Sequence, residues 1–143
     1  MKAFHLQPAM LSYGNVFYPV GHMVLMFPTE QDARDAAALL ARDGYDEDEI
    51  ALLTPASIRE QLARAAGDGL HRQSLDEIAA VHRFLQLASL GHHALMVHAP
   101  AIHETSHIMY LLRGTRISYG QKYRPVAIEH LGGTARDFAA ASD

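Results

Sequence analysis

The sequence of 143 residues predicts a mixed α/β domain in which a strand–helix–strand unit occurs twice. When Pro28 is aligned with Pro100, the apolar run 23–27 falls on the run 95–99. The segments that follow carry apolar residues at matching helical positions, and each copy then passes a turn into a second extended run. Two such units that share one sheet form a ferredoxin-like α/β sandwich, which is the fold we expect.

This single domain is expected to span residues 22–131, with halves at 22–54 and 94–131. In the first half, Thr29 is a good N-cap, so we expect a helix from this residue to the turn at Gly44. Acidic side chains in its first turn suit the positive end of the helix dipole. An extended run of apolar residues follows the turn and completes the unit.

Between the halves lies an expected helical insert at 55–91. We expect one helix over 55–66 and a second from Ser74 to Leu90, where Glu77 completes a capping box with Ser74. The second helix is apolar over more of its surface than one buried face requires. It is therefore expected to contact two surfaces.

The strands of the first half are apolar on both faces. Val24 and Met26 point to one side of the sheet, while Leu25 and Phe27 point to the other, and the second copy repeats the pattern. A sheet with helices on one side only would expose one of these faces. We therefore expect the insert or a second subunit to cover it, and the sequence predicts a homodimer or larger oligomer.

Composition limits the classes of partner. A net charge of -4 argues against general binding to nucleic acid or to an anionic membrane, because both need a basic surface. The lack of cysteine excludes disulfides and thiolate chemistry and fits a cytoplasmic protein. No apolar stretch is long enough to span a bilayer. Residues 1–21 are expected to form an apolar arm that lies along the domain or across a neighbouring subunit. Residues 132–143 are expected to form a flexible tail.

Several segments resemble a known family. An apolar strand precedes an alanine-rich helix at 29–40, Asp43 opens an acidic turn before 50–53, and the chain closes with 117–120 and 125–131. Over residues 22–131 this order is similar to the general stress protein 17M family of heat-induced proteins. The resemblance implies a stress-associated cytosolic bacterial protein without an assigned biochemical activity. The family has no catalytic motif, so it implies no site residue.

The sharpest chemical pattern is His103, Glu104 and His107, which matches the zinc motif H-E-x-x-H. On a helix the two histidines would share one face and the glutamate could activate water, with Glu129 as the candidate third ligand. In the repeat alignment, however, both histidines fall on the solvent side of the helix. A zinc-dependent hydrolase and incidental metal binding are therefore the alternatives, and a solvated histidine pair is the simplest interpretation.

Charge is uneven along the chain. The loop 43–49 is acidic, and basic side chains gather with tyrosines near the matching turn of the second half. Arginine and lysine can hold a phosphate while tyrosines stack on a base, so the cluster is a candidate site for a small anionic ligand, with a solvated turn as the alternative. The candidate ligand-binding residues are Arg113, Arg116, Tyr119, Lys122, Tyr123 and Arg124.

His98 takes an apolar strand position, where a hydrogen-bonded core histidine is expected. If it shares a sheet face with Met96, it could join His22 or a histidine of another subunit and form a pH-sensitive interface. The sequence thus predicts a non-enzymatic oligomeric module that binds a small ligand or a protein partner, with no cofactor. Zinc is implied only by the alternative hydrolase.

Overall fold

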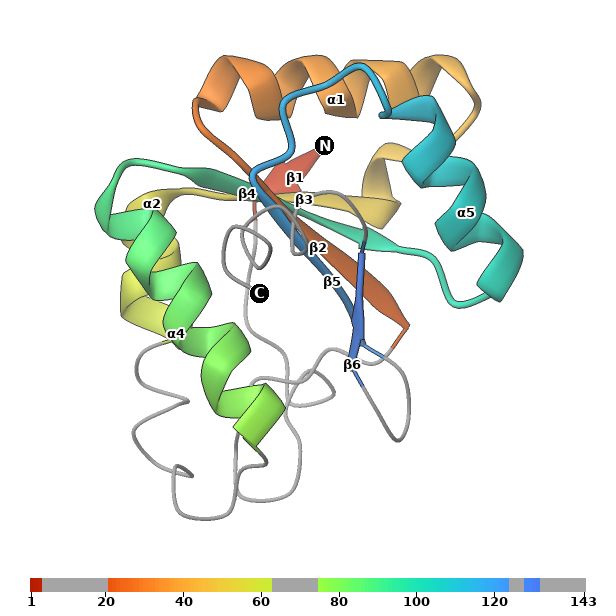
Figure 1. Cartoon of the computed structure of the whole chain (residues 1–143). Helices are drawn as coiled ribbons and strands as arrows, with labels where there is room; N and C mark the ends of the chain where they lie inside the picture. Colours follow the sequence, from red (N-terminus) through yellow and green to blue (C-terminus); the bar gives the residue numbers. More distant parts are fainter. Residues whose placement is uncertain (4–20, 63–74, 124–127, 132–143) are drawn as a thin grey trace.

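The computed structural model describes residues 1–3, 21–62, 75–123 and 128–131, which form a six-stranded sheet with helices on both faces (Figure 1). The strand order is β1-β3-β4-β2-β5-β6. All neighbouring strands are antiparallel except β1, which runs parallel to β3 at the edge of the sheet. The strands are β1 (Lys2–Ala3), β2 (His22–Phe27), β3 (Ile50–Leu53), β4 (His93–His98), β5 (Tyr119–Tyr123) and β6 (Ile128–His130).

The helices largely follow the expected order. In α1 (Glu30–Arg42), Thr29 is the N-cap, and its hydroxyl accepts a hydrogen bond from the Asp32 amide at 3.0 Å. The longest described helix, α4 (Leu75–Ser89), agrees with the helix expected to end at Leu90. The second half supplies α5 (Ile102–Leu111), and a short 3-10 turn, η2 (Glu47–Glu49), precedes β3.

The helix expected over 55–66 needs a correction. Only α2 (Pro55–Ser57) is α-helical, and the chain continues as the π-helical turn η3 (Ile58–Leu62). Ile58 and Leu62 are both buried against the sheet, four residues apart, so the wider turn still delivers an apolar face to the core. Residues 63–66 lie outside the described part of the chain, as do the capping residue Ser74, the arm beyond Ala3 and the tail 132–143.

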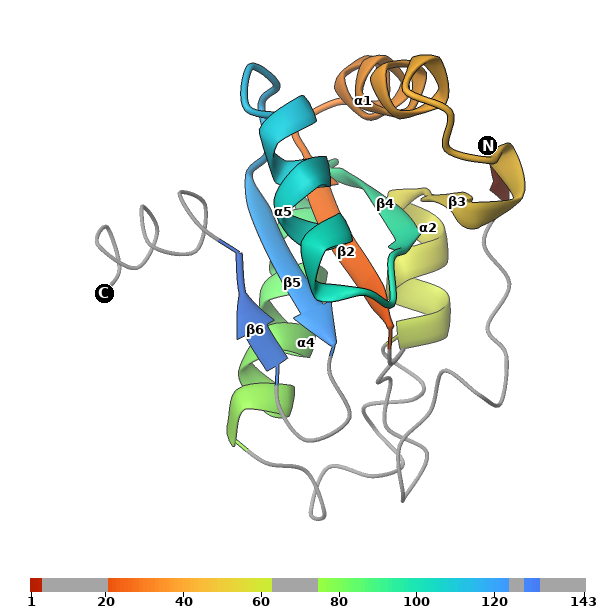
Figure 2. The same ribbon diagram turned by 90° about the vertical axis from the view of Figure 1, so that its right-hand side faces the viewer.

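One face of the sheet is covered by α1 and α5, which lie on the same side in both views (Figure 2). Ala33 and Ala36 are fully buried in α1, and their small side chains let the helix lie close to the strands. From α5 and the residue that follows it, Ile108 and Leu112 are buried in the same core. This core therefore joins the two halves that the sequence alignment had paired.

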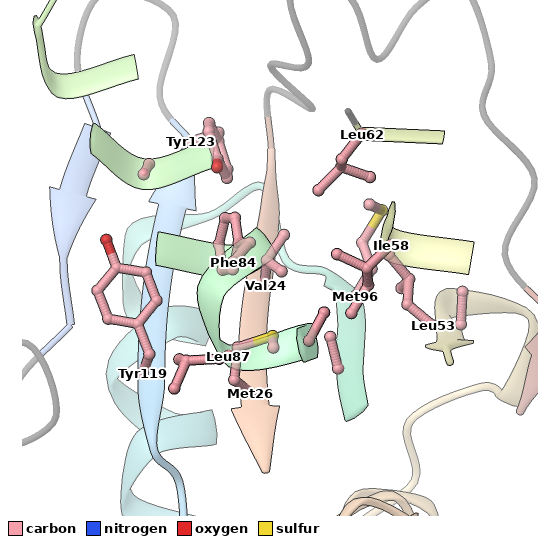
Figure 3. Close-up of a cluster of buried hydrophobic side chains, with 14 residues drawn as sticks. Val24, Met26, Leu53, Ile58, Leu62, Phe84, Leu87, Met96, Tyr119 and Tyr123 are labelled. Atoms are coloured by element: carbon pink, nitrogen blue, oxygen red, sulfur yellow. The ribbon is translucent and has the colours of Figure 1, made fainter. Parts of the chain in front are cut away.

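The opposite face is covered by the insert. Phe84 and Leu87 of α4, together with Ile58 and Leu62, pack on strand residues that include Val24 (Figure 3). The expectation that neither sheet face is solvated is thus confirmed. Because the insert itself covers the second face, that face gives no reason to expect another subunit. An oligomer would need a different surface.

Candidate functional site

The predicted ligand cluster is spread over the fold, and Lys122 shows this most clearly. Its side chain is only 2% exposed and lies on the sheet face that α5 covers. There its Nζ donates a hydrogen bond of 2.6 Å to Oγ1 of Thr105. Because Lys122 points into the protein, the expectation that it faces a surface ligand needs correction.

The two tyrosines point to the other face of the sheet. Tyr119 is 6% and Tyr123 1% exposed, and both belong to the core under α4 (Figure 3). The Tyr119 ring meets Phe84 edge to face, with centroids 5.3 Å apart. Alternation along β5 is the reason, since residues 119, 121 and 123 share one face and residue 122 takes the other. The tyrosines cannot stack a base at the surface from these positions.

The remaining members of the cluster are exposed arginines in separate places. The guanidinium of Arg113 lies 4.0 Å from the centre of the Tyr110 ring, and its Nη1 donates to the Tyr110 carbonyl at 2.7 Å. Arg116 lies 3.5 Å from a carboxylate oxygen of Asp32, at the start of α1. Arg124 lies outside the described residues. A role in anion binding for the arginines stays a prediction.

The H-E-x-x-H segment forms the first two turns of α5. Glu104 is held against its own helix, since its Oε1 accepts a hydrogen bond of 2.9 Å from the backbone amide of Ala101. His103 is exposed, and Nε2 of His107 lies 2.8 Å from Oδ2 of Asp43. Glu104 is thus a helix-capping residue and His107 a link between α5 and the end of α1. The expected solvent-side position of both histidines is confirmed.

The third candidate ligand, Glu129, lies on β6 opposite Lys122 in the sheet register. The structure describes its backbone but not its side chain. Among the described residues, no three histidine or carboxylate side chains converge closely enough to hold a metal ion. Neighbouring negative charges nevertheless mark the region around Glu104. Burial, followed by the charges of Glu104 and Asp43, raises the pKa of Tyr45.

Histidines of the second half contact carboxylates of the first half at three points. These contacts bring the start, the end and the following turn of α1 to β4 and α5. The acidic loop 43–49 was recognised from the sequence. Its contacts with histidines were not, because the partners lie 49 to 64 residues away along the chain. The pairs are His93 with Glu30 at 3.7 Å, His98 with Glu49 at 2.9 Å and His107 with Asp43 at 2.8 Å.

His22 and His98 are direct partners across β2 and β4, and their ring centroids lie 4.9 Å apart. The suggested approach of these two histidines is therefore confirmed, whereas a role in an interface between subunits is a separate prediction. His98 is partly exposed rather than a core residue. The reason is its place at the last position of β4, where the sheet opens to solvent.

Two pockets lie at the β1 end of the sheet. The larger, of about 270 Å³, runs under α1, where Arg34 pairs with Glu30 at 2.7 Å and the Met1 amine pairs with Glu47 at 2.8 Å. Alanine methyl groups form much of its wall. The smaller, of about 80 Å³, contains His22 and His98. The larger pocket is just below the size typical of sites for organic ligands, roughly 300–1,000 Å³.

The outward side of α5 is a surface that sequence analysis missed. Ile102 is 67% and Tyr110 59% exposed, and Ser106 lies between them on the same helical face. Outward positions of a surface helix normally carry charge. The signal was present in the sequence, because the only charged residue of α5 apart from its histidines is the capping Glu104.

No protein-family model, no curated protein and no solved structure matches this chain. None of the helices in the described ranges is long and apolar enough to cross a membrane.

Proposed function

We propose that this protein is a non-enzymatic homodimeric module, and that the outward face of α5 forms its dimer interface. The observation that carries the proposal is the exposed row Ile102, Ser106 and Tyr110, which puts two large hydrophobic side chains on the outward surface of α5. We further propose a cytoplasmic, stress-associated or regulatory role in bacteria, in line with the resemblance to the 17M family. The antiparallel order β3-β4-β2-β5, with α1 and α5 on one face, supports a duplicated ferredoxin-like unit.

A comparison of the two helices on that face supports the choice of α5. Outward positions of α1 include Glu30, Arg34 and Asp35, which suit contact with water. In α5 the aligned positions hold Ile102, Ser106 and His107. Two helices with equivalent places in the fold thus present different side chains to the outside. Large apolar groups together with aromatic residues and arginine are typical of protein interfaces.

The spacing on α5 fits a second copy of the same helix. Ile102 and Tyr110 flank Ser106 at equal distances of four residues. If two copies of α5 pack antiparallel about a twofold axis at Ser106, each Ile102 meets the Tyr110 of its partner, and the small serines let the helices approach. No carboxylate or lysine side chain on this row would oppose itself across the axis.

Arg113 prepares the aromatic anchor for this contact. Its guanidinium lies on the Tyr110 ring and is fixed by the hydrogen bond to the Tyr110 carbonyl. A side chain held in place loses less conformational entropy on association than a mobile one. Tyrosine and arginine are also enriched among the residues that contribute most to binding.

The interface is expected to be weak. A helix of ten residues is about 15 Å long. Stable complexes bury about 800 Å² on each partner, which is more than one short helix offers. The dimer should therefore form and dissociate with concentration, which suits a regulatory module.

Sedimentation velocity from micromolar to near-millimolar concentration tests the proposal. The wild-type protein should shift from monomer towards dimer, and Ser106→Glu should abolish the shift because two carboxylates would meet at the axis. Ser106 is exposed, so this change leaves the core intact. Leu90→Glu is the matched control, since Leu90 is 69% exposed but lies outside α5. A monomer at every concentration, or a dimer that Ser106→Glu leaves intact, would reject the proposal.

The alternative hydrolase built on His103, Glu104 and His107 makes a different demand. Such an enzyme needs stoichiometric zinc and a glutamate that can reach the metal-bound water. In this protein Glu104 already accepts the Ala101 amide, which supports its structural role. Hydrolysis lost in Glu104→Gln but retained in Ser106→Glu would favour the enzyme over the binding module.

A further inference from the structure

We propose that His22 and His98 form a binding site for a divalent transition-metal ion such as Zn²⁺, Ni²⁺ or Cu²⁺ at the end of β2 and β4. The two residues face each other across antiparallel strands, and their rings are inclined by 46° with centroids 4.9 Å apart. This site shares no residue with the α5 surface and does not depend on the proposed dimer.

Glu49 orients one of the two ligands. Nδ1 of His98 lies 2.9 Å from Oε2 of Glu49, and because a carboxylate can only accept, the ring donates its proton from Nδ1. Nε2 of His98 then carries the lone pair. This carboxylate–imidazole arrangement is the one that fixes the tautomer and raises the basicity of metal-bound histidine in proteins.

Gly21 leaves space on the Nε2 side of that ring. A Cβ atom at this position would lie 3.9 Å from Nε2 of His98, in direct contact with the coordinating side of the imidazole. Gly21 also has φ +83°, a left-handed conformation that other residues rarely adopt. The backbone of Gly21 is fixed by two hydrogen bonds. Its amide donates to the Tyr123 carbonyl at 2.8 Å, and its carbonyl accepts from the Ala99 amide at 2.9 Å. The backbone of the sheet thus keeps a residue without a side chain beside Nε2 of His98.

The distance between the histidines suits one ion. Zinc–nitrogen bonds of about 2.0–2.1 Å in tetrahedral geometry place two ligand nitrogens roughly 3.4 Å apart. With ring centroids 4.9 Å apart, the two imidazoles are near enough to share one ion while His98 keeps its contact with Glu49. Imidazole nitrogen is a preferred ligand for zinc, nickel and copper and a poor one for magnesium or calcium, which fixes the class of ion.

The surrounding pocket also favours a small hydrated cation. It measures about 80 Å³, and among the described residues that line it, Asp48 and Glu49 contribute two carboxylates against one ammonium from Lys2. A water molecule occupies about 30 Å³, so the space holds an ion and one or two waters but no organic ligand of ordinary size. Waters would complete the coordination, since two imidazoles converge among the described residues.

Isothermal titration of protein purified without a histidine tag tests the site with ZnSO₄, NiSO₄ and CuSO₄. We expect one ion per chain, a loss of at least tenfold in affinity for His22→Ala and for His98→Ala, and a loss of about 10- to 100-fold for Glu49→Gln. Lys2→Gln should bind more tightly because it removes an ammonium group from the lining of the pocket.

The pair His103 and His107 supplies the control, because histidines four residues apart on a helix can also chelate an ion. The double variant His103→Ala, His107→Ala should bind as the wild type does. Loss of binding in this variant, retention in His22→Ala with His98→Ala, or no binding of any of the three ions would overturn the proposal.

A second measurement needs no variant. Paramagnetic Cu²⁺ at substoichiometric ratios should broaden the amide resonances around His22, Met96 and His98 in the wild-type protein. Broadening centred on α5 would place the ion at the other histidine pair and contradict the proposal.

Discussion

Lys122 donates a hydrogen bond of 2.6 Å to Thr105, and this contact joins the inner side of α5 to β5 in a region where both side chains are buried. The Nζ of a lysine is costly to bury unless hydrogen bonds satisfy it. The hydroxyl of Thr105 therefore contributes to holding the amine inside the fold. It also explains why Lys122 is unavailable to a surface ligand.

Thr105→Val should lower the free energy of unfolding by about 1–3 kcal/mol, because it keeps the shape of the side chain but removes one acceptor of the buried Lys122 amine. Thr105→Ser, which keeps the hydroxyl, is the control and should lose less. Urea denaturation of the three proteins measures the difference. Equal stability of Thr105→Val and wild type would show that the bond contributes nothing.

Gly120 lies opposite Leu25 in the sheet, and a Cβ atom added to it would come within 2.9 Å of a methyl carbon of Leu25 and 3.5 Å of the Cβ of Leu131. Because overpacking a core displaces neighbours, Gly120→Ala should destabilise the fold by about 1–3 kcal/mol. Gly114→Ala is the matched control, as nothing lies within 4 Å of its added Cβ. Thermal unfolding of both variants checks the prediction, which fails if the two melt together.

Much of the fold could be predicted because the signals are local. The apolar runs around Val24 and Met96 identify strands, and Thr29 marks the start of a helix in both the sequence and the structure. Alternation along β2 also predicted two buried faces. What covers the second face was left open, since periodicity alone cannot tell whether the apolar stripe of α4 packs within the chain or on another subunit.

The candidate site was harder to predict because it depends on direction and long-range contact. Arg113, Lys122 and Tyr123 are close in sequence, but alternation along β5 and the end of α5 send them to three different places. The approach of His22 to His98 was foreseen from the shared face, whereas the contact of His98 with Glu49 was not. The register of β3 against β4, in which Ile50 pairs with Val97, brings Glu49 beside His98, and this requires knowing which strands are neighbours in the sheet.

His92 gives the protein a pH-dependent contribution to stability. Burial, followed by the positive charges of Arg83 and His93, lowers the pKa of His92 below its usual value, while Nδ1 lies 2.9 Å from the hydroxyl of Ser118. The folded state thus prefers the neutral ring. Since the unfolded chain takes up the proton at its ordinary pKa, about 6.5, this contribution is present above that pH and is lost as the pH falls below it.

The stability of wild type relative to His92→Gln should therefore decrease as the pH is lowered from about 7.5 to 5.5, on either side of the ordinary histidine pKa. Glutamine retains a group that can pair with Ser118 but does not titrate in this range. Urea midpoints at several pH values measure the difference, which removes contributions common to both proteins. A difference that stays constant or grows at acid pH would contradict the assigned direction.

Phe84 tests whether α4 is required to close the second face of the sheet. Its ring is fully buried under α4 and meets Tyr119 edge to face at 5.3 Å (Figure 3). Phe84→Ala should cost about 3–5 kcal/mol because it removes a large apolar group and leaves a cavity. Leu90→Ala, at the exposed end of the same segment, should change stability by less than about 0.5 kcal/mol.

Hydrogen exchange then locates the effect: if α4 covers the sheet, amides of β2 and β5 should lose protection in Phe84→Ala but not in Leu90→Ala. Unchanged protection of both strands would mean that the insert is dispensable to the core.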